Sequence, residues 1–185
     1  MKKRLGTLMV VFAMVAVLAV PVFAAPPGPT IVDVAVAANA PGGEYEGLFD
    51  CLIAAVVGTG LDAPLSGNGQ FTVFAPIDPA FEALGLDCSS ATAAEDSATF
   101  LVETYGQDAV TEILLYHVAR GNREASAVTN SNRIRTLQGS FLFVDGTILT
   151  DQVGRNANII VPDVTAPSNG VIHAIDLVVL PFALP

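Results

Sequence analysis

The chain has 185 residues, with 18 acidic and only 8 basic side chains, so its formal net charge at pH 7 is −10. Three basic residues lie in the first four positions, and their removal with a leader would leave five arginines against eighteen acids, a charge of −13. A surface this acidic repels nucleic acid and anionic membranes, so we expect neither as a partner. The remaining length suits one domain with a substantial core.

Residues 1–24 predict a secretory signal peptide. A basic start precedes an apolar run at residues 8–20, and Ala24 supplies a small side chain at a cleavage position. The apolar run is too short to cross a bilayer as a helix. We therefore expect cleavage after Ala24, release outside the cell and no transmembrane span. Residues 25–29 should form a short flexible leader, followed by one domain over residues 30–185.

Cys51 and Cys88 are the only cysteines in the sequence. Export would place them in an oxidising compartment, so we predict that they form a disulfide. The alternative is a reactive or metal-binding pair, which would need histidine or basic residues nearby in the sequence, and none is present.

The first half of the chain has mainly helical patterns. Thr30 and Asp33 have the spacing of a capping box, and apolar residues follow at helical intervals. Residues 48–57 form a second helical pattern that ends at a glycine-rich turn. Residues 71–75 are rich in β-forming side chains and predict a buried strand.

Asp78 and Pro79 predict the start of another helix. Proline suits a first helical turn, and the Asp78 carboxylate could accept hydrogen bonds from the helix's own unpaired N–H groups. We expect residues 88–97 to form a polar, alanine-rich loop. A further helix is predicted over residues 108–119, with His117 on its apolar side.

From residue 125 the pattern changes to strands. Asp145-Gly146 is a strong hairpin signal between two of them. The predicted strands cover residues 134–137, 141–144, 147–150 and 159–164. Helices followed by strands predict an α+β domain.

Residues 169–181, NGVIHAIDLVVLP, are apolar on both alternating faces and predict a central strand that Pro181 ends. Asn169 and Gly170 form a turn signal, because both tolerate positive φ. His173 and Asp176 are polar residues in this apolar stretch, so each needs an internal partner. They could form a hydrogen-bond network that locks the strand register, or a pH-sensitive switch.

Three motifs together carry a family resemblance. Residues 70–81, QFTVFAPIDPAF, resemble the opening motif of fasciclin-type (FAS1) domains, residues 169–181 resemble their closing motif, and Tyr116-His117 matches the Tyr-His element between them. The sequence departs from the family pattern at Ile77, where threonine is usual. The resemblance implies an α+β fold, a fasciclin-like β-wedge or sandwich with several helices packed alongside.

The resemblance also implies a function. Fasciclin-type domains are generally non-enzymatic, so we expect a secreted adhesion or interaction module that binds a cell-surface or matrix protein or glycan. The alternative is an extracellular carrier of an apolar small molecule, a carotenoid or a lipid, which would need a cavity of several hundred cubic ångströms. The motif residues should be structural and could contribute to adhesion: Asp78, Tyr116, His117, Asn169, Gly170, His173 and Asp176.

The sequence contains few side chains in patterns that could catalyse a reaction or bind a metal or cofactor. The sequence has two histidines and no HxH, HExxH, P-loop or nucleophile-elbow pattern, so we expect no enzyme, metal or cofactor. A hydrolase would need His117 or His173 within reach of a serine and a carboxylate. We expect His117 to be a neutral core histidine. The arginine pairs Arg120/Arg123 and Arg133/Arg135 are solvated, pair with local acids, or bind a carboxylate or sulfated sugar.

Overall fold

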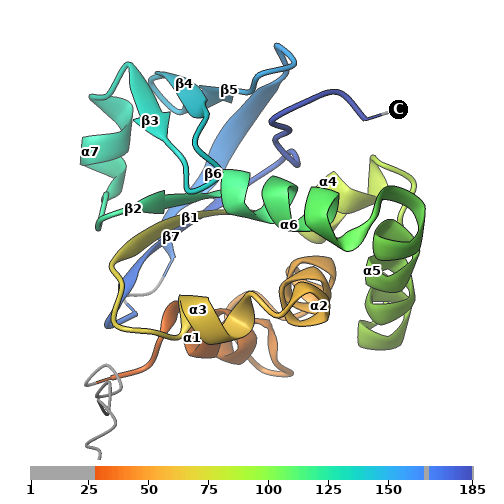
Figure 1. The fold of residues 1–185 in the computed structure, drawn as a ribbon. Coiled ribbons are helices and arrows are strands. Elements are labelled where there is room, and N and C mark those ends of the chain that lie inside the picture. The colour runs from red at the N-terminus through yellow and green to blue at the C-terminus, as the bar shows by residue number, and fades with distance from the viewer. Residues whose placement is uncertain (1–27, 165–166, 185) are drawn as a thin grey trace, which may run out of the picture.

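The computed structural model describes residues 28–164 and 167–184, in which helices pack against one seven-stranded sheet (Figure 1). The signal-peptide prediction, residues 1–24, lies outside the described residues. The helices are α1 (Ile31–Asn39), α2 (Asp50–Thr59), α3 (Asp62–Leu65), α4 (Asp78–Glu82), α5 (Ala91–Tyr105), α6 (Gln107–Tyr116) and α7 (Ala125–Thr129). The strands are β1 (Phe71–Pro76), β2 (Val118–Arg120), β3 (Arg133–Arg135), β4 (Phe141–Asp145), β5 (Ile148–Thr150), β6 (Asn156–Val164) and β7 (Gly170–Ile175).

The sheet has the strand order β2-β1-β7-β6-β5-β4-β3. The β1–β7 pair is parallel and the other neighbouring strands are antiparallel. The two edges approach each other, because Ala119 bridges Thr136 and the Leu137 N–H donates to the Val118 carbonyl at 2.6 Å. The sheet is therefore nearly closed into a barrel, and the predicted α+β class is confirmed.

Strand β7 lies inside the sheet and is buried on both faces, as its apolar pattern predicted. Ile172 and Ala174 belong to the core between the sheet and the helices. Ile175 belongs to a second core enclosed by the curved sheet, together with Phe74 of β1. One strand thus supplies both cores, which makes its register important for the whole domain.

The disulfide between Cys51 and Cys88 is confirmed. Their Cα atoms are 5.5 Å apart, and both residues are buried. The bridge joins the start of α2 to the segment before α5.

Asp78 does not cap its own helix, so that prediction was wrong. Its carboxylate accepts hydrogen bonds from the N–H groups of Asp50 (3.1 Å) and Cys51 (3.0 Å), at the start of α2. Phe49 precedes α2 and has no side chain able to cap it, so a residue from a distant segment satisfies these donors. Burial raises the pKa of Asp78, and the two N–H donors partly oppose this effect.

The loop predicted over residues 88–97 ends at Ser90, because residues 91–97 are the start of α5. Ser90 caps this helix by accepting from the Ala93 N–H at 3.2 Å, and the alanines that suggested a loop are strong helix formers. Two further boundaries differ. The change to strands was placed at residue 125, but residues 125–129 form a short helix, α7, before the first strand of that region. The helix predicted to reach residue 119 ends at Tyr116, because residues 118–120 pair with β1 as strand β2.

The hairpin at Asp145-Gly146 is confirmed, since β4 and β5 are antiparallel neighbours and Gly146 has a φ of 60°. Asn169 and Gly170, in contrast, have no positive φ. Gly170 is required for space, because a Cβ there would collide with the Phe71 carbonyl oxygen and the Ile31 side chain. The predicted strand at residues 169–181 also ends early, at Ile175.

Gly170→Ala should therefore destabilise the protein by more than about 2 kcal/mol, because the new methyl overlaps main chain that cannot move aside. Gly58→Ala is the matched control. It lies inside α2, and its Cβ would meet no atom within 4 Å. It should be neutral or stabilise by up to about 1 kcal/mol. Urea unfolding of both variants measures the difference, and equal effects would contradict the close-approach explanation.

Asp78→Ala should lower the free energy of unfolding by about 2–4 kcal/mol, because one buried and one partly buried N–H group at the start of α2 would lose a carboxylate acceptor. Glu82→Ala, at an exposed position of the same helix, is the control and should change it by less than about 0.5 kcal/mol. Thermal and urea unfolding measure both. A small effect of Asp78→Ala would show that water replaces the carboxylate.

Candidate functional site

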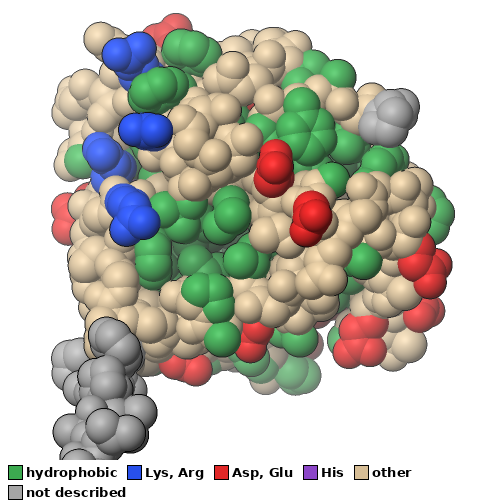
Figure 2. Space-filling view, in the orientation of Figure 1, with side chains coloured by type: hydrophobic (Ala, Val, Ile, Leu, Met, Phe, Trp, Pro, Cys, Tyr) green, Lys and Arg blue, Asp and Glu red, His purple; other side chains and the backbone are tan. Residues whose placement is uncertain are grey.

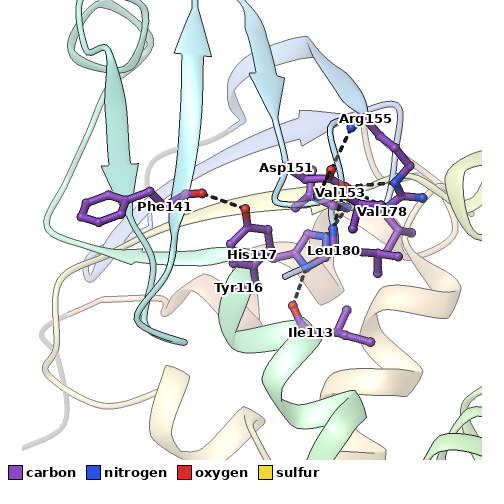
Figure 3. Close-up of polar contacts among 10 residues, drawn as sticks. Ile113, Tyr116, His117, Phe141, Asp151, Val153, Arg155, Val178 and Leu180 are labelled. Atoms are coloured by element: carbon purple, nitrogen blue, oxygen red, sulfur yellow. Dashed lines mark hydrogen bonds and ion pairs between the residues drawn. The ribbon is translucent and has the colours of Figure 1, made fainter. Parts of the chain in front are cut away.

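The segment that follows β7 runs through the interior without a strand partner. Side chains take the place of that partner (Figure 3). The Val179 N–H donates to Nε2 of His117 at 3.1 Å, and the Leu180 N–H donates to Oδ2 of Asp151 at 3.0 Å. Arg155 donates from Nη2 to the Val178 carbonyl at 2.6 Å. These three contacts explain how residues 178–180 can be buried outside the sheet.

The structure places His117 in the core, where only 2% of its surface is exposed. Nε2 accepts from the Val179 N–H, so the ring proton is on Nδ1, which donates to the Ile113 carbonyl at 2.8 Å. Burial lowers the pKa of His117 to about 4, because a charged ring would lose its hydration. The imidazole is therefore neutral at physiological pH and joins the end of α6 to the closing segment.

Tyr116, the preceding residue, points into the core enclosed by the sheet. Its side chain is fully buried, and its hydroxyl donates to the Phe141 carbonyl at 2.8 Å (Figure 3). Burial raises the pKa of Tyr116 to about 12. A side chain in this position packs the fold and does not reach a partner at the surface.

Asp151 and Arg155 form an ion pair that the sequence motifs did not predict, in which the aspartate is buried and the arginine is partly exposed. Asp151 is 3% exposed, and its Oδ2 lies 2.9 Å from Nη2 of Arg155. Its Oδ1 accepts from the N–H groups of Val153 and Arg155, both at 2.9 Å. The contacts of Asp151 with Val153 and Arg155 could have been predicted from the sequence, because an aspartate before a glycine turn commonly accepts from nearby N–H groups. No sequence pattern indicates its contact with the distant Leu180.

Asn169 joins three segments at the other end of β7. Its side-chain oxygen accepts from the Ile31 N–H at 2.7 Å, which satisfies the first turn of α1. Its amide nitrogen donates to the carbonyls of Leu65 (2.7 Å) and Gly67 (3.0 Å). The asparagine is fully buried, so these partners replace water completely.

His173 is also fully buried, in the middle of β7. Nδ1 accepts from the Asp163 N–H at 3.2 Å, so Nε2 carries the proton and donates to the Arg123 carbonyl at 2.7 Å. The ring stacks on Phe74 with 5.7 Å between centroids. Burial lowers the pKa of His173 as well. The residue holds both the loop after β2 and the irregular end of β6.

Asp176 is only partly buried and lies where β6 and β7 lose their regular pairing. It accepts hydrogen bonds from the main-chain N–H of Asn158 at 2.7 Å and from its side-chain amide at 2.8 Å. The Asp176 N–H donates back to the Asn158 carbonyl at 3.2 Å. Three contacts with one residue of β6 hold the end of β7 in register.

The positions of these residues indicate that they stabilise the fold rather than catalyse a reaction or bind a metal. Both ring nitrogens of His117 and of His173 are occupied by main-chain groups, so neither ring is free to activate a serine. Asp78 lies near Cys51 and Cys88, with ligand atoms within 4.8 Å of one another, but the sulfur atoms are joined in the disulfide. They are not thiolates able to bind a metal.

The cavities bear on the carrier alternative. Two apolar cavities between the helices and the sheet have volumes of about 60 and 40 Å³. Ligand pockets usually measure about 300–1,000 Å³. Two larger hollows, of about 550 and 350 Å³, are open to solvent and carry charged residues on their walls. Among residues 28–164 and 167–184, therefore, the enclosed apolar cavities are too small for a carotenoid or lipid, and the hollows of sufficient size are open to solvent.

These features define an α+β domain with a nearly closed sheet and buried, internally satisfied motif residues. The chain matches the Fasciclin domain family over residues 47–181, and it belongs to that family. None of the helices in the described part of the chain combines the length and apolar character needed to cross a membrane.

Several known proteins are similar to this chain. Protein sll1483 of Synechocystis sp. is 39% identical over 136 residues, covering 72% of this chain and 67% of that protein. Uncharacterized protein sll1735 of the same organism is 33% identical, covering 82% of this chain and 98% of that protein. Transforming growth factor-beta-induced protein ig-h3 of Sus scrofa is 31% identical over 140 residues, 75% of this chain but only 18% of that protein.

A solved structure shares the fold. It is a FAS1 domain pair from the insect cell adhesion molecule fasciclin I, with a TM-score of 0.58 and 19% identity. The match covers 82% of this chain and 51% of that one, so the chain spans about half of the domain pair.

The buried histidines predict a specific loss of stability in acid. The folded-state pKa of His117 is about 4, below its ordinary value of 6.5, so the unfolded chain takes up the proton first as pH falls. The stabilisation is complete above pH 6.5 and is lost between pH 6.5 and about 4, by roughly 3 kcal/mol for this residue. His173 acts in the same direction.

His117→Gln tests this pH dependence, because glutamine can accept from the Val179 N–H but does not titrate. The variant should be less stable at pH 7 and should show a shallower loss between pH 6.5 and 4 in urea unfolding. The carboxylates and His173 are the same in both proteins and serve as the internal control. Parallel curves for the two proteins would contradict a role for His117 titration.

Proposed function

We propose that this protein is a secreted, non-enzymatic interaction module that attaches to a cell-surface or matrix protein or glycan. FAS1 domains are generally interaction modules without catalytic activity, and the chain belongs to this family. The similar domain pair comes from a cell adhesion molecule.

The observation that carries the proposal is the internal position of the motif side chains. Tyr116, His117, Asn169 and His173 are each 2% exposed or less and are hydrogen-bonded to main-chain groups. They preserve a rigid fold and do not converge on an open cleft. A partner would then bind to residues of the outer surface, as expected for an interaction module.

Two features support export. Residues 1–24 have the pattern of a signal peptide, and the Cys51–Cys88 disulfide is the kind of bond that persists in oxidising compartments. The acidic mature chain would remain soluble after release.

The test uses the mature protein collected from the medium of its own secreting cells. Beads coated with it should bind intact cells or their extracellular polymer, and beads coated with disulfide-reduced, denatured protein should not. The mass of the collected protein should place its N-terminus at Ala25. Absence of bead adhesion would contradict the proposal. A small molecule that co-purifies in native mass spectrometry and is lost on organic extraction would instead favour a carrier.

A further inference from the structure

The near closure of the sheet brings arginines from separate segments together. Arg120 ends strand β2, Arg123 follows in the next loop, and Arg135 ends strand β3 at the opposite sheet edge. The two edges meet at the bridge between Ala119 and Thr136. The three arginines, with Thr136, Leu137 and Gly139, line a surface hollow of about 350 Å³, which we call the arginine hollow.

Basic side chains are concentrated on this part of an acidic molecule. Figure 2 shows the Lys and Arg side chains gathered along one edge, over the region of β2 and β3 in Figure 1. Several Asp and Glu side chains gather at the lower right of the same view, toward α5. The five arginines that follow the predicted signal peptide are the four of β2, the loop after it and β3, and Arg155, which is partly buried and paired with Asp151. The hollow is thus a local exception to a charge of −13.

Among the residues that the structure describes, no carboxylate forms an ion pair with an arginine of the hollow. Within residues 28–164 and 167–184, Arg155 is the one arginine that forms an ion pair. Nε of Arg123 is buried and has no hydrogen-bond partner, and Arg135 donates only a 3.3 Å bond to the Gly139 carbonyl. A buried donor without an acceptor raises the free energy of the folded protein, so an acceptor that reached Nε of Arg123 would stabilise it. The expected pairing with local acids is not seen here.

The main chain of Arg123 is held in place by hydrogen bonds with side chains of β1 and β7. Thr72 accepts from the Arg123 N–H at 2.9 Å and donates to the Gly121 carbonyl at 2.6 Å. The buried His173 donates to the Arg123 carbonyl at 2.7 Å. A wall fixed in this way loses little conformational entropy when a ligand binds, which favours recognition.

We propose that the arginine hollow binds carboxylate or sulfate groups of an acidic extracellular polysaccharide. This inference rests on the proposed function and names the partner class. Guanidinium groups match planar carboxylate and sulfate oxygens with paired, charge-assisted hydrogen bonds. A volume of about 350 Å³ lies within the range of ligand sites.

Side chains next to the hollow suit a sugar rather than a bare anion. Arg133 and Phe143 are directly opposite in the β3–β4 pair, so they share one face of the sheet. Phe143 is 48% exposed, and Arg133 lies over the Phe141 ring at 4.7 Å. An exposed aromatic ring offers an apolar surface for the C–H face of a sugar ring beside the cations that hold its acidic group.

The overall negative charge sets the conditions under which binding is expected. The acidic remainder repels a polyanion over long distances, but at about 0.1 M ionic strength charges are screened beyond about 10 Å. The attraction of the polyanion to the nearby arginines then exceeds its repulsion by the distant acidic residues. Binding should weaken again at about 1 M salt, where even close exposed charges are screened.

The test measures binding of the full mature protein to immobilised dextran sulfate, polygalacturonate and neutral dextran at about 0.1 M salt. The wild type should bind one or both acidic polymers and not neutral dextran. R120Q/R135Q should bind at least tenfold more weakly, because two guanidinium contacts are lost. Circular dichroism and thermal unfolding should show that this variant is folded, since both side chains are exposed.

The matched control is T92E/Q107E, which changes the net charge by the same two units. Both positions are exposed, in the first turns of α5 and α6, where acidic residues are favourable. Helix α5 lies at the other end of the molecule from β3 (Figure 1). The control should bind as the wild type does. Equal losses in the two variants would overturn the proposal, because net charge alone would explain them.

Other outcomes separate the partner class from the proposed function. Wild-type affinity in R120Q/R135Q overturns the assignment of the hollow, and equal binding of inorganic polyphosphate overturns the assignment to a glycan. If neither acidic polymer binds but the coated beads still attach to cells, the inference fails and the interaction module stands. If the beads also fail to attach, both proposals fail.

Discussion

The structure depends on one requirement: buried main-chain polar groups that leave the sheet or end a helix must still find hydrogen-bond partners. The closing segment after β7 meets it with His117, Asp151 and Arg155, which bind the main chain of residues 178–180. Asn169 and Asp78 do the same for the starts of α1 and α2. Each unsatisfied group would cost about 1–3 kcal/mol, so these few side chains decide whether the fold is stable.

The polar motif residues stabilise the fold, whereas residues of the outer surface remain available to bind a partner. Most of the polar residues that define the family motifs face inward, and their side chains form hydrogen bonds within the protein itself. The arginine hollow is an example of this arrangement, because His173 and Thr72 support it from below while Arg120 and Arg135 form its walls. A buried motif can in this way position a surface site without touching the ligand.

Periodicity and turn chemistry were sufficient for the local elements. The capping box at Thr30, strand β1 and the hairpin at Gly146 depend on neighbours in the sequence, and the structure agrees with them. The errors occurred where a distant partner decided the outcome. Asp78 had the spacing to cap its own helix but binds α2, and the apolar run after Ile175 continues as buried chain, because side chains replace a strand partner.

By itself, the sequence determined the α+β class, the family, the disulfide and the requirement that His117 and His173 be internally bonded. The class follows from periodicity, the family from the resemblance of three motifs, the disulfide from two cysteines in a chain with an export signal, and the internal bonding from the cost of burying polar groups. Only the tertiary structure decided which groups those side chains bind, that Asp151 holds Leu180, and that the two edges of the sheet bring Arg120 and Arg135 together. The physical reason is that such contacts join residues distant in the chain, and their geometry is set by strand order and sheet curvature rather than by any local pattern.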